Sequence, residues 1–333
     1  MTKREGQNES TKRKEITMSQ NHYRVAIIGA GVMGQRMIEA IAKHPQYDVA
    51  AICDASESRA QETAERAGNA AWYTDAIRLL DNEDVDLIYL AVPPKFHHPI
   101  ALAALSRNKH LLCEKPLANS IEEAEDMLAA AKAAGVIHAM HFPIYYQSLL
   151  PVMQERLREL GEIRRIDILT HFHQWPRPWQ QVPWLAGREQ GGFIREVLPH
   201  FIHLTYALFG DLQVIRSHVQ YPPDPLACET GISAYLELAD GTPVTVNGLA
   251  NIAHQEHLDY RVYGTEGTFS LVNWTNLHMG GQNEAPQRLE IPLHERLIQL
   301  LDEFALAMEG KKARLVPFEV GVKVQRILED LRG

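Results

Sequence analysis

The chain has 333 residues, of which 45% are hydrophobic and 23% are charged, and its formal net charge is −9 at pH 7. These values are ordinary for a globular protein, and at about 150 residues per domain they favour two domains. The negative charge argues against a nucleic-acid or anionic-membrane surface, and the sequence has no run of about 18 apolar residues that would span a membrane.

Residues 1–20 are polar and charged and contain few large apolar side chains. Such a segment buries too little surface to offset its ordering entropy, so we expect a disordered tail. No apolar stretch near the N-terminus has the character of a secretory signal. The three cysteines, Cys53, Cys113 and Cys228, are too scattered for a disulfide framework or a zinc knuckle. These features favour a reducing, cytoplasmic compartment.

Short β-rich runs alternate with helical stretches in the first half of the chain. The expected strands are 24–28, 47–53, 85–92, 109–113 and 136–140, and the expected helices are 32–43, 57–67, 98–107 and 121–134. Several strands are continuously apolar, which is typical of a parallel sheet covered on both faces. Ser120 and Glu123 form a capping box, and Gly135 supplies a helix stop. The alternation predicts an α/β fold with a doubly wound parallel sheet.

The second half has a different pattern, with several consecutive strands and no helices between them. After a helix at about 146–160 and a strand at 163–172, a loop rich in Trp and Pro leads to a Gly-Gly pair and a helix that ends near Gly210. Further strands are expected at 212–219, 231–239, 243–250, 257–263 and 268–272, and helices at 293–309 and 318–332. This arrangement predicts an antiparallel sheet.

A glycine-rich segment directly follows the first strand and opens a helix, with the spacing G-x-G-x-x-G. The first glycine permits a tight turn, the second lets a pyrophosphate approach the backbone, and the third lets helix and strand pack closely. The helix N-terminus then offers N–H groups to the phosphates. The cofactor contacts expected in this segment come from Gly29, Gly31, Val32, Met33 and Gly34.

Asp54 ends the second strand, at the position where a carboxylate binds the ribose hydroxyls of a dinucleotide. A carboxylate there favours NAD, because it repels the additional phosphate of NADP. Ser56 and Arg59 are close enough in sequence to bind that phosphate. NAD is therefore the expected cofactor, and NADP stays open.

Two further segments follow strands at the edge of the sheet where ligands bind in open α/β folds. Val92, Pro93 and His97 follow the 85–92 strand, and Glu114 and Lys115 follow the 109–113 strand. A lysine at this edge would lie near the nicotinamide, although an ordinary surface lysine would give the same pattern. The bond between this lysine and the following proline could be cis, which would fix its placement.

Taken together, these motifs resemble the Gfo/Idh/MocA oxidoreductases, the group of glucose–fructose oxidoreductase and inositol dehydrogenase. The resemblance covers about residues 23–332. Its motifs are Gly29–Gly34, Asp54, Pro93-x-x-x-His97, Glu114-Lys115-Pro116, Gly191-Gly192, Glu196-x-x-x-His200 and Tyr263-Gly264-Thr265-Glu266-Gly267. It implies an NAD(P)-binding Rossmann domain at 21–142. It also implies an α/β domain at 143–333 with a large, mostly antiparallel open sheet, used for substrate binding and oligomer contacts, and with C-terminal helices that pack back.

The resemblance also assigns the chemistry. In that family a lysine, an aspartate and a histidine four positions later are catalytic, and here they correspond to Lys115, Glu196 and His200. A histidine can remove the hydroxyl proton, a carboxylate at i−4 on the same helix can orient its ring, and a lysine can polarise the substrate oxygen. The sequence departs from the family pattern at Glu196, which replaces the aspartate, and at Leu198, commonly a glycine. Pro199 is expected to kink or restart the helix.

Aromatic and polar side chains near these motifs are candidates for substrate binding. Aromatic faces beside polar groups suit sugars and cyclic polyols, although each could equally be a core or interface residue. His203 replaces an aspartate that often follows the catalytic histidine. The substrate-binding candidates are His141, Tyr145, Trp184 and His203. Several histidines are paired in sequence, but none has the H-E-x-x-H pattern, so we expect no metal.

The leading hypothesis is an NAD(P)-dependent dehydrogenase or reductase that acts on a hydroxyl-bearing carbon of a sugar, sugar derivative or cyclic polyol. Two alternatives stay open: reduction of an imine or unsaturated ring on the same scaffold, and a non-catalytic dinucleotide sensor. Retention of Lys115, Glu196 and His200 argues against the sensor, because binding alone needs none of them. A broad antiparallel sheet needs covering, so we expect a homodimer or homotetramer with no nucleic-acid or membrane partner.

Overall fold

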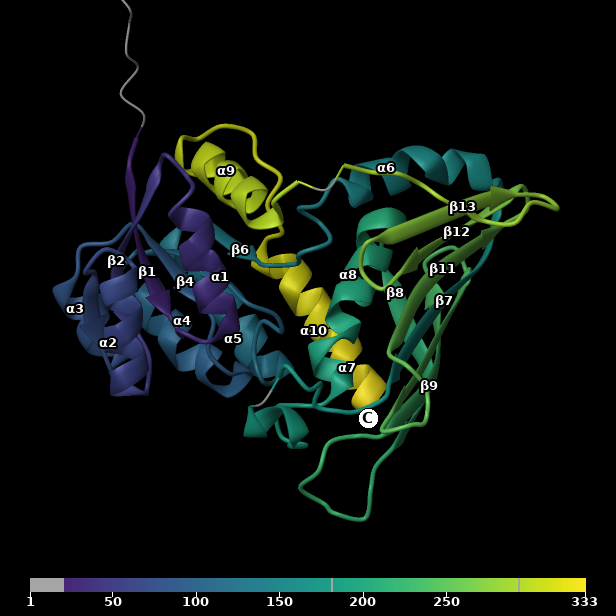
Figure 1. Cartoon of the computed structure of the whole chain (residues 1–333), viewed down its shortest axis with the longest axis horizontal. Coiled ribbons are helices and arrows are strands. Elements are labelled where there is room, and N and C mark those ends of the chain that lie inside the picture. The colour runs from purple at the N-terminus through teal and green to yellow at the C-terminus, as the bar shows by residue number, and fades with distance from the viewer. Residues whose placement is uncertain (1–20, 181, 293) are drawn as a thin grey trace, which may run out of the picture.

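The computed structural model describes residues 21–180, 182–292 and 294–333. The tail predicted at 1–20 lies outside these residues. The chain forms two β-sheets, which lie on opposite sides of a central group of helices (Figure 1). Within the described ranges, no helix is both long and apolar enough to cross a membrane.

The first sheet is parallel and has six strands in the order β3-β2-β1-β4-β5-β6. Its strands are β1 Tyr23–Ile28, β2 Tyr47–Cys53, β3 Ala71–Tyr73, β4 Leu87–Leu90, β5 His110–Cys113 and β6 His138–Met140. The central strand β4 is buried along its whole length because helices cover both faces of the sheet. The prediction of a doubly wound parallel sheet is confirmed.

The helices of this half follow the strands in turn. They are α1 Val32–Ile41, α2 Glu57–Arg66, α3 Ala76–Asn82, the 3₁₀ turn η1 Pro94–Phe96, α4 His97–Leu105 and α5 Ile121–Ala134. The start of α5 is the predicted one: the Glu123 N–H donates to Ser120 Oγ, and the Glu123 carboxylate accepts from the Asn119 N–H. Gly135, with φ +63°, ends this helix as expected. The sequence prediction missed β3 and α3.

The second sheet has eight strands in the order β14-β13-β12-β11-β7-β10-β9-β8. Its strands are β7 Ile163–Phe172, β8 Leu212–Gln220, β9 Gly231–Leu238, β10 Pro243–Ala250, β11 His257–Gly264, β12 Gly267–Val272, β13 Asn276–Gly281 and β14 Gln287–Arg288. All neighbours are antiparallel except β7 and β10, which run parallel. The prediction of a mostly antiparallel sheet is confirmed, although β13 and β14 were not foreseen.

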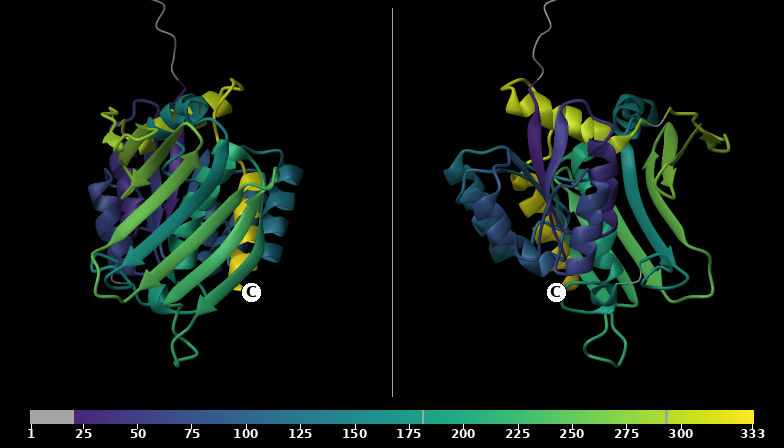
Figure 2. Two further views of the ribbon diagram at one scale, coloured as in Figure 1. Left: turned by 90° about the vertical axis from the view of Figure 1, so that its right-hand side faces the viewer. Right: turned by 60° about the vertical axis from the view of Figure 1, so that its left-hand side comes forward.

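The remaining helices lie on one side of this sheet. They are α6 Leu149–Arg156, the 3₁₀ turns η2 Leu157–Leu160 and η3 Pro183–Ala186, α7 Phe193–Glu196, α8 Leu198–Phe209, α9 Arg296–Met308 and α10 Phe318–Arg332. The helices α8 and α10 lie between the two sheets (Figure 1). The opposite face of the second sheet carries none of the described helices (Figure 2), and Ile215, Tyr235 and Leu249 on its strands are exposed.

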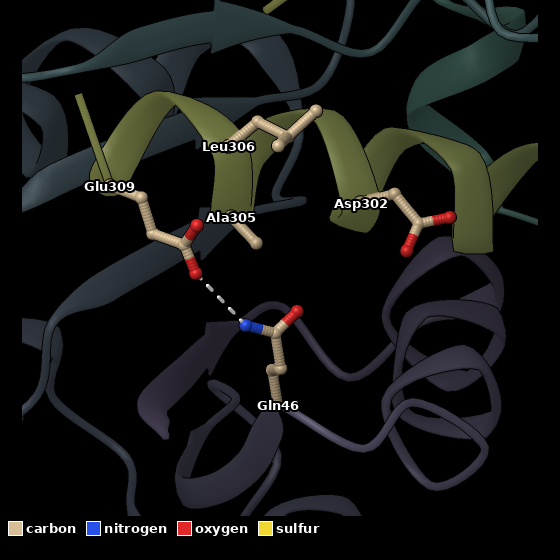
Figure 3. A pocket seen from close by; sticks show the side chains of 5 residues that line it. All are labelled: Gln46, Asp302, Ala305, Leu306 and Glu309. Carbon is tan, nitrogen blue, oxygen red and sulfur yellow. Dashed lines mark hydrogen bonds between the residues drawn. The ribbon is translucent and has the colours of Figure 1, made fainter. Parts of the chain in front are cut away.

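Near the end of the chain, α9 returns to the first half and packs on α1. The Tyr47 hydroxyl donates to the Leu301 carbonyl at 3.0 Å, and His44 Nε2 lies 3.0 Å from an Asp302 carboxylate oxygen. Beside these contacts is a shallow hollow of about 230 Å³, in which Gln46 donates to Glu309 at 3.3 Å (Figure 3). None of the candidate site residues lines this hollow.

Candidate active site

The glycine-rich loop between β1 and α1 is shaped by contacts that exclude a side chain at two positions. Gly29 has φ +104°, and a Cβ atom there would overlap the carbonyl of Ala91, the residue directly after β4. At Gly34 a Cβ atom would overlap the Gly29 carbonyl. At Gly31, by contrast, none of the described atoms lies within 4 Å of the Cβ position. The loop therefore closes tightly on the sheet and leaves open space above its middle glycine, as a bound pyrophosphate requires.

The N-terminus of α1 faces this open space. Gly31 is its N-cap and supplies no side-chain hydrogen bond, and the first turn contains no acidic residue. The Val32 side chain is half exposed. The first N–H groups of α1 and the positive end of its dipole are thus available to a phosphate.

Asp54 follows β2 and is held against the glycine-rich loop. One of its carboxylate oxygens accepts from the Ala30 N–H at 3.0 Å, and the other accepts from the Ser56 N–H at 2.9 Å. Arg59 forms an ion pair with it at 3.1 Å, and the Arg59 side chain is more than half exposed. The predicted ribose-binding carboxylate therefore lies beside the loop, with a cation at its outer side.

Lys115 follows β5 at the carboxyl edge of the first sheet, and its peptide bond to Pro116 is cis. Its ammonium group donates to the Glu196 carbonyl at 2.9 Å and to Glu196 Oε2 at 2.6 Å. The Lys115 side chain is 9% exposed. The lysine is therefore a buried, positioned cation, and the alternative of a free surface lysine is wrong.

Glu196 ends α7, and its carboxylate is held from two sides. Oε2 accepts from Lys115, and Oε1 accepts from Gln180 Nε2 at 3.1 Å. A new helix, α8, starts at Leu198 with Pro199 in its first turn, as the proline predicted. Because the helix is interrupted, the carboxylate pairs with Lys115, and the sequence-based expectation that it orients the His200 ring is not met.

His200 lies in the first turn of α8 and is 8% exposed. Its ring packs edge-on against Trp274 at 5.3 Å and faces Phe142 at 6.4 Å. Burial, followed by the nearby charges of Lys115 and His141, lowers the pKa of His200 well below 6.5. Among the described residues its Nδ1 has no hydrogen-bond partner. His200 is thus a neutral imidazole at neutral pH and can accept a proton.

His97 and Glu114 occur in the motifs expected to contact the cofactor, and both are buried. His97 spans two loops of the ligand edge, with Nε2 at 2.8 Å from the Val92 carbonyl and Nδ1 at 3.2 Å from the Leu117 carbonyl. Glu114 Oε1 accepts from the Tyr89 hydroxyl at 2.5 Å and lies 2.7 Å from His141 Nδ1. Both residues therefore hold other parts of the site in place.

His203 lies near His200, since Phe142 packs against both histidine rings. His203 is 2% exposed, and its ring stacks on Phe142 at 4.2 Å. Burial lowers the pKa of His203 to about 3. The ring of Tyr145 meets His203 edge-on at 5.5 Å, so the two form one aromatic cluster. The remaining candidates are only partly buried, and they are Met33, Val92, Pro93, Tyr145 and Trp184.

Sequence reasoning missed several residues of the site. Tyr89 lies within the apolar strand predicted at 85–92, and its hydroxyl group in that run was a usable signal. Gln180 lies in the loop rich in Trp and Pro. The composition of this loop distinguished it from its surroundings but did not identify Gln180 as a site residue. Trp274 and Glu229 come from distant parts of the chain and left no signal near the motifs. Glu229 accepts from the Ile194 N–H at 2.7 Å and so holds the start of α7.

Over the described ranges, no three or more His, Cys, Asp or Glu side chains are grouped as ligands of one ion. The polar groups at the ligand edge are a lysine, a carboxylate and two imidazoles, which suit proton transfer to and from an oxygen.

Known proteins are similar to this chain over most of its length. One family model matches residues 23–142 and describes an oxidoreductase family with an NAD-binding Rossmann fold, and a second matches 155–331 and describes its C-terminal alpha/beta domain. Levoglucosan dehydrogenase from Pseudarthrobacter phenanthrenivorans is 25% identical over 285 residues, which cover 73% of this chain and 72% of that protein.

Two solved structures have the same fold. The 3-ketoreductase KijD10 from Actinomadura kijaniata, in complex with NADP and TDP-benzene, has a TM-score of 0.83 at 22% identity and covers 94% of this chain and 97% of its own. A levoglucosan dehydrogenase in complex with NADH has a TM-score of 0.82 at 20% identity, with coverage of 94% and 96%. The first half of the present chain is an NAD-binding Rossmann domain.

Proposed function

The chain belongs to the Gfo/Idh/MocA family of oxidoreductases, and on that premise we propose that it transfers hydride between NAD(P) and a hydroxyl-bearing carbon of a sugar, sugar derivative or cyclic polyol. The observation that carries the proposal is the convergence of Lys115, Glu196 and His200 at the carboxyl edge of a dinucleotide-binding sheet. Ligand binding alone needs no buried lysine beside a neutral histidine.

The residues around the glycine-rich loop fit a dinucleotide. The open space at Gly31 and the N–H groups of α1 would hold the pyrophosphate, and Asp54 would accept the ribose hydroxyls. Asp54 favours NAD, while Arg59 is the group that would meet the additional phosphate of NADP. When bound, the nicotinamide supplies the carbon that accepts or returns the hydride.

The protein contributes proton transfer and charge stabilisation. The Lys115 ammonium group would donate to the substrate oxygen and stabilise the negative charge that develops on it. His200 would take the hydroxyl proton as the carbon is oxidised, and it would return that proton when the reaction runs towards the alcohol. Glu196, which accepts from Lys115 at 2.6 Å, would hold the ammonium group in position. We propose Lys115, His200 and Glu196 as the catalytic residues.

The substrate class is proposed from two aromatic candidates and from a relative of the chain. Tyr145 and Trp184 offer partly exposed aromatic surface, which suits the apolar faces of a sugar or cyclic polyol. Levoglucosan dehydrogenase, a relative over most of the chain, is named for a sugar derivative. The enzyme is also proposed to be a homo-oligomer, because the uncovered face of the second sheet exposes apolar side chains.

The test is nicotinamide absorbance with NAD and NADP against a panel of sugars, inositols and hydroxy acids. We expect turnover by the wild type and a loss of about 100- to 1,000-fold in Lys115→Met, since a single donor to a developing oxyanion is worth that much. The affinity for NADH should stay within about threefold, because Lys115 is proposed to act on the substrate.

The matched control is Lys43→Met, which removes an exposed lysine paired with Glu295 on the surface. Undiminished turnover in Lys115→Met would contradict the proposed mechanism. Tight NADH binding without turnover on any alcohol or ketone of the panel would instead favour imine reduction or a sensor.

A further inference from the structure

Arg195, directly before Glu196 on α7, carries a buried guanidinium group that the proposed hydride transfer does not use. The residue is 5% exposed. Its Nη1 donates to the Asn119 side-chain oxygen at 3.0 Å and also to the Glu189 carbonyl, and its Nη2 donates to the Asn119 carbonyl at 3.1 Å. Nη2 also lies 3.3 Å from Glu329 Oε1 on α10. One cation therefore joins α7, α10 and the loop between β5 and α5.

Asn119 is the partner in the first half of the chain, and it lies four positions after Lys115 in the same loop. The guanidinium group holds both oxygens of Asn119, because its N–H groups form a planar fork. The N–H of Asn119 donates to Glu123 Oε2 in the first turn of α5. This end of the loop is therefore fixed between Arg195 and α5.

Arg195 and Glu196 are consecutive residues of α7, and they bind the two ends of one loop. Glu196 accepts from Lys115 at 2.6 Å near the beginning of the loop, and Arg195 holds Asn119 near its end. A single contact would let the loop pivot about it, whereas two separate contacts also fix its orientation. The loop belongs to the NAD-binding domain and α7 to the C-terminal domain. The two contacts therefore join the NAD-binding domain to the domain that carries His200.

The proposed reaction depends on the spacing between these two domains. Lys115 and His200 have to reach the same substrate oxygen, although they come from different domains. A misplacement of catalytic groups by about 1 Å costs on the order of 100-fold in rate. A contact that fixes Lys115 relative to α7 and α8 should therefore affect the chemical step more than substrate binding.

We propose that Arg195 is a positioning residue that keeps Lys115 and His200 at the spacing required for the reaction. The inference rests on the proposed function, in which both residues act on one oxygen. In this role Arg195 acts through Asn119 and α7 and touches no reacting atom. A lysine in its place would keep the charge, but one ammonium group cannot reproduce the planar fork that holds both oxygens of Asn119.

The first test compares Arg195→Met and Arg195→Lys with the wild type, on the panel substrate that the wild type converts fastest. Turnover is expressed per NADH-binding site, counted by titration calorimetry. We expect kcat to fall about 100-fold in Arg195→Met and to recover partly in Arg195→Lys, while KM and the dissociation constant of NADH stay within about threefold. A merely structural role would lower the number of NADH-binding sites and leave kcat per site unchanged.

Asn119→Ala tests the contact itself, because it removes one acceptor of Arg195 and is a milder change. We expect kcat to fall about tenfold, as for the loss of one hydrogen bond to a charged group. A variant that combines Arg195→Met with Asn119→Ala should be no slower than Arg195→Met alone, since both changes break the same contact. Losses that multiply in the combined variant would contradict the inference.

The matched control is Arg332→Met, on α10. Arg332 donates to Glu329 Oε2 at 3.4 Å and to the Arg188 carbonyl at 3.0 Å, and both partners belong to the C-terminal domain. We expect its kcat to equal that of the wild type. Equal losses of kcat in Arg195→Met and Arg332→Met would overturn the inference.

Amide hydrogen exchange supplies a readout that needs no substrate. Residues 114–123 should exchange at least about tenfold faster in Arg195→Met than in the wild type, and at the wild-type rate in Arg332→Met, because only the first variant releases the loop. Unchanged exchange in Arg195→Met would overturn the inference even if turnover falls. A wild type that converts no member of the panel would count against the proposed function, and the exchange rates would still decide whether Arg195 holds the loop.

Discussion

At the scale of single residues, Lys115 and Glu196 form an ion pair that is mostly shielded from water. A buried pair adds little net stability, but removing one partner leaves an uncompensated charge at a cost of about 3–5 kcal/mol. Gln180 binds the second oxygen of Glu196 and so keeps the carboxylate directed at the lysine. The longer side chain of glutamate, compared with the aspartate of the family pattern, thus lets one carboxylate contact both Lys115 and Gln180.

The middle glycine of the dinucleotide loop allows a test that separates binding from folding. A Cβ atom at Gly31 would occupy open space, so we expect Gly31→Ala to change the free energy of unfolding by less than about 1 kcal/mol. The same atom would stand where the pyrophosphate has to approach, so the dissociation constant of NADH should rise at least about tenfold.

Titration calorimetry and urea unfolding would measure the two quantities. Gly29→Ala is the contrasting variant, because its Cβ atom would overlap the Ala91 carbonyl and its φ is +104°. That variant should lose stability as well as binding. Full NADH affinity in Gly31→Ala would contradict the proposed position of the pyrophosphate.

At the scale of elements, the break between α7 and α8 separates the two ends of the catalytic motif. Glu196 closes the short helix α7, and His200 belongs to the first turn of α8. Glu229 holds the start of α7 through the Ile194 N–H, and burial raises the pKa of this carboxyl group. The direction of Glu196 therefore depends on a residue that precedes β9, far from it in sequence.

Gly192 is the N-cap of α7, and its substitution should disturb the site. Its φ is +91°, and a Cβ atom there would overlap the Glu229 carboxylate. We expect Gly192→Ala to lose about 3 kcal/mol of stability and to lower turnover, because both backbone strain and the displaced carboxylate act on α7.

Gly210 provides the matched control, since its φ is +89° and none of the described atoms lies within 4 Å of its Cβ position. Gly210→Ala should lose only about 1–2 kcal/mol of stability, the cost of the strained backbone, and its turnover should equal that of the wild type. Equal losses in the two variants, measured by urea unfolding, would show that the contact with Glu229 is unimportant.

Local sequence patterns predicted the longer helices and strands. The prediction failed for elements and contacts that form only because of tertiary structure. The three-residue strand β3 and the two-residue strand β14 are too short for a periodic pattern, and each exists because a neighbouring strand pairs with it. The glycine-rich loop, Asp54 and Lys115 were predicted because each follows a recognisable strand. The pairing of Glu196 with Lys115 was not, since their separation of 81 positions leaves no local pattern.

At the scale of the whole molecule, the uncovered face of the second sheet predicts self-association. Leu249 on β10 is 37% exposed on this face. We expect sedimentation velocity to give a dimer or tetramer for the wild type and a smaller species for Leu249→Glu, because a charge there would be buried without a partner. Ile77→Glu, on α3 of the first half, should keep the wild-type size. A monomeric wild type would contradict the proposal.

Buried neutral histidines predict a loss of stability in acid. Burial lowers the pKa of His203 to about 3 and also lowers the pKa values of His97 and His200, whereas the unfolded chain titrates near 6.5. Below about pH 6.5 the unfolded state binds more protons. The stabilisation is therefore complete above that pH, and it is lost as the pH falls, by up to about 1.4 kcal/mol per pH unit for each histidine.

His203→Phe keeps a ring to stack on Phe142 and removes one titrating group. We expect the slope of unfolding free energy against pH, measured with urea between pH 6 and 5, to decrease by about 1.4 kcal/mol per unit. His218→Phe, at an exposed position, should leave the slope unchanged. The same slope in His203→Phe and the wild type would show that protonation of His203 does not contribute to the loss of stability in acid.

The return of α9 to the first sheet also affects how the protein is made. Tyr47 and His44 are translated 254 and 258 positions before their partners Leu301 and Asp302. When the ribosome has synthesised the first sheet, it has therefore not yet synthesised α9, which packs on α1 in the folded protein. Since domains generally fold in the order in which they are synthesised, we expect part of the surface of the first half to stay uncovered until α9 has been made.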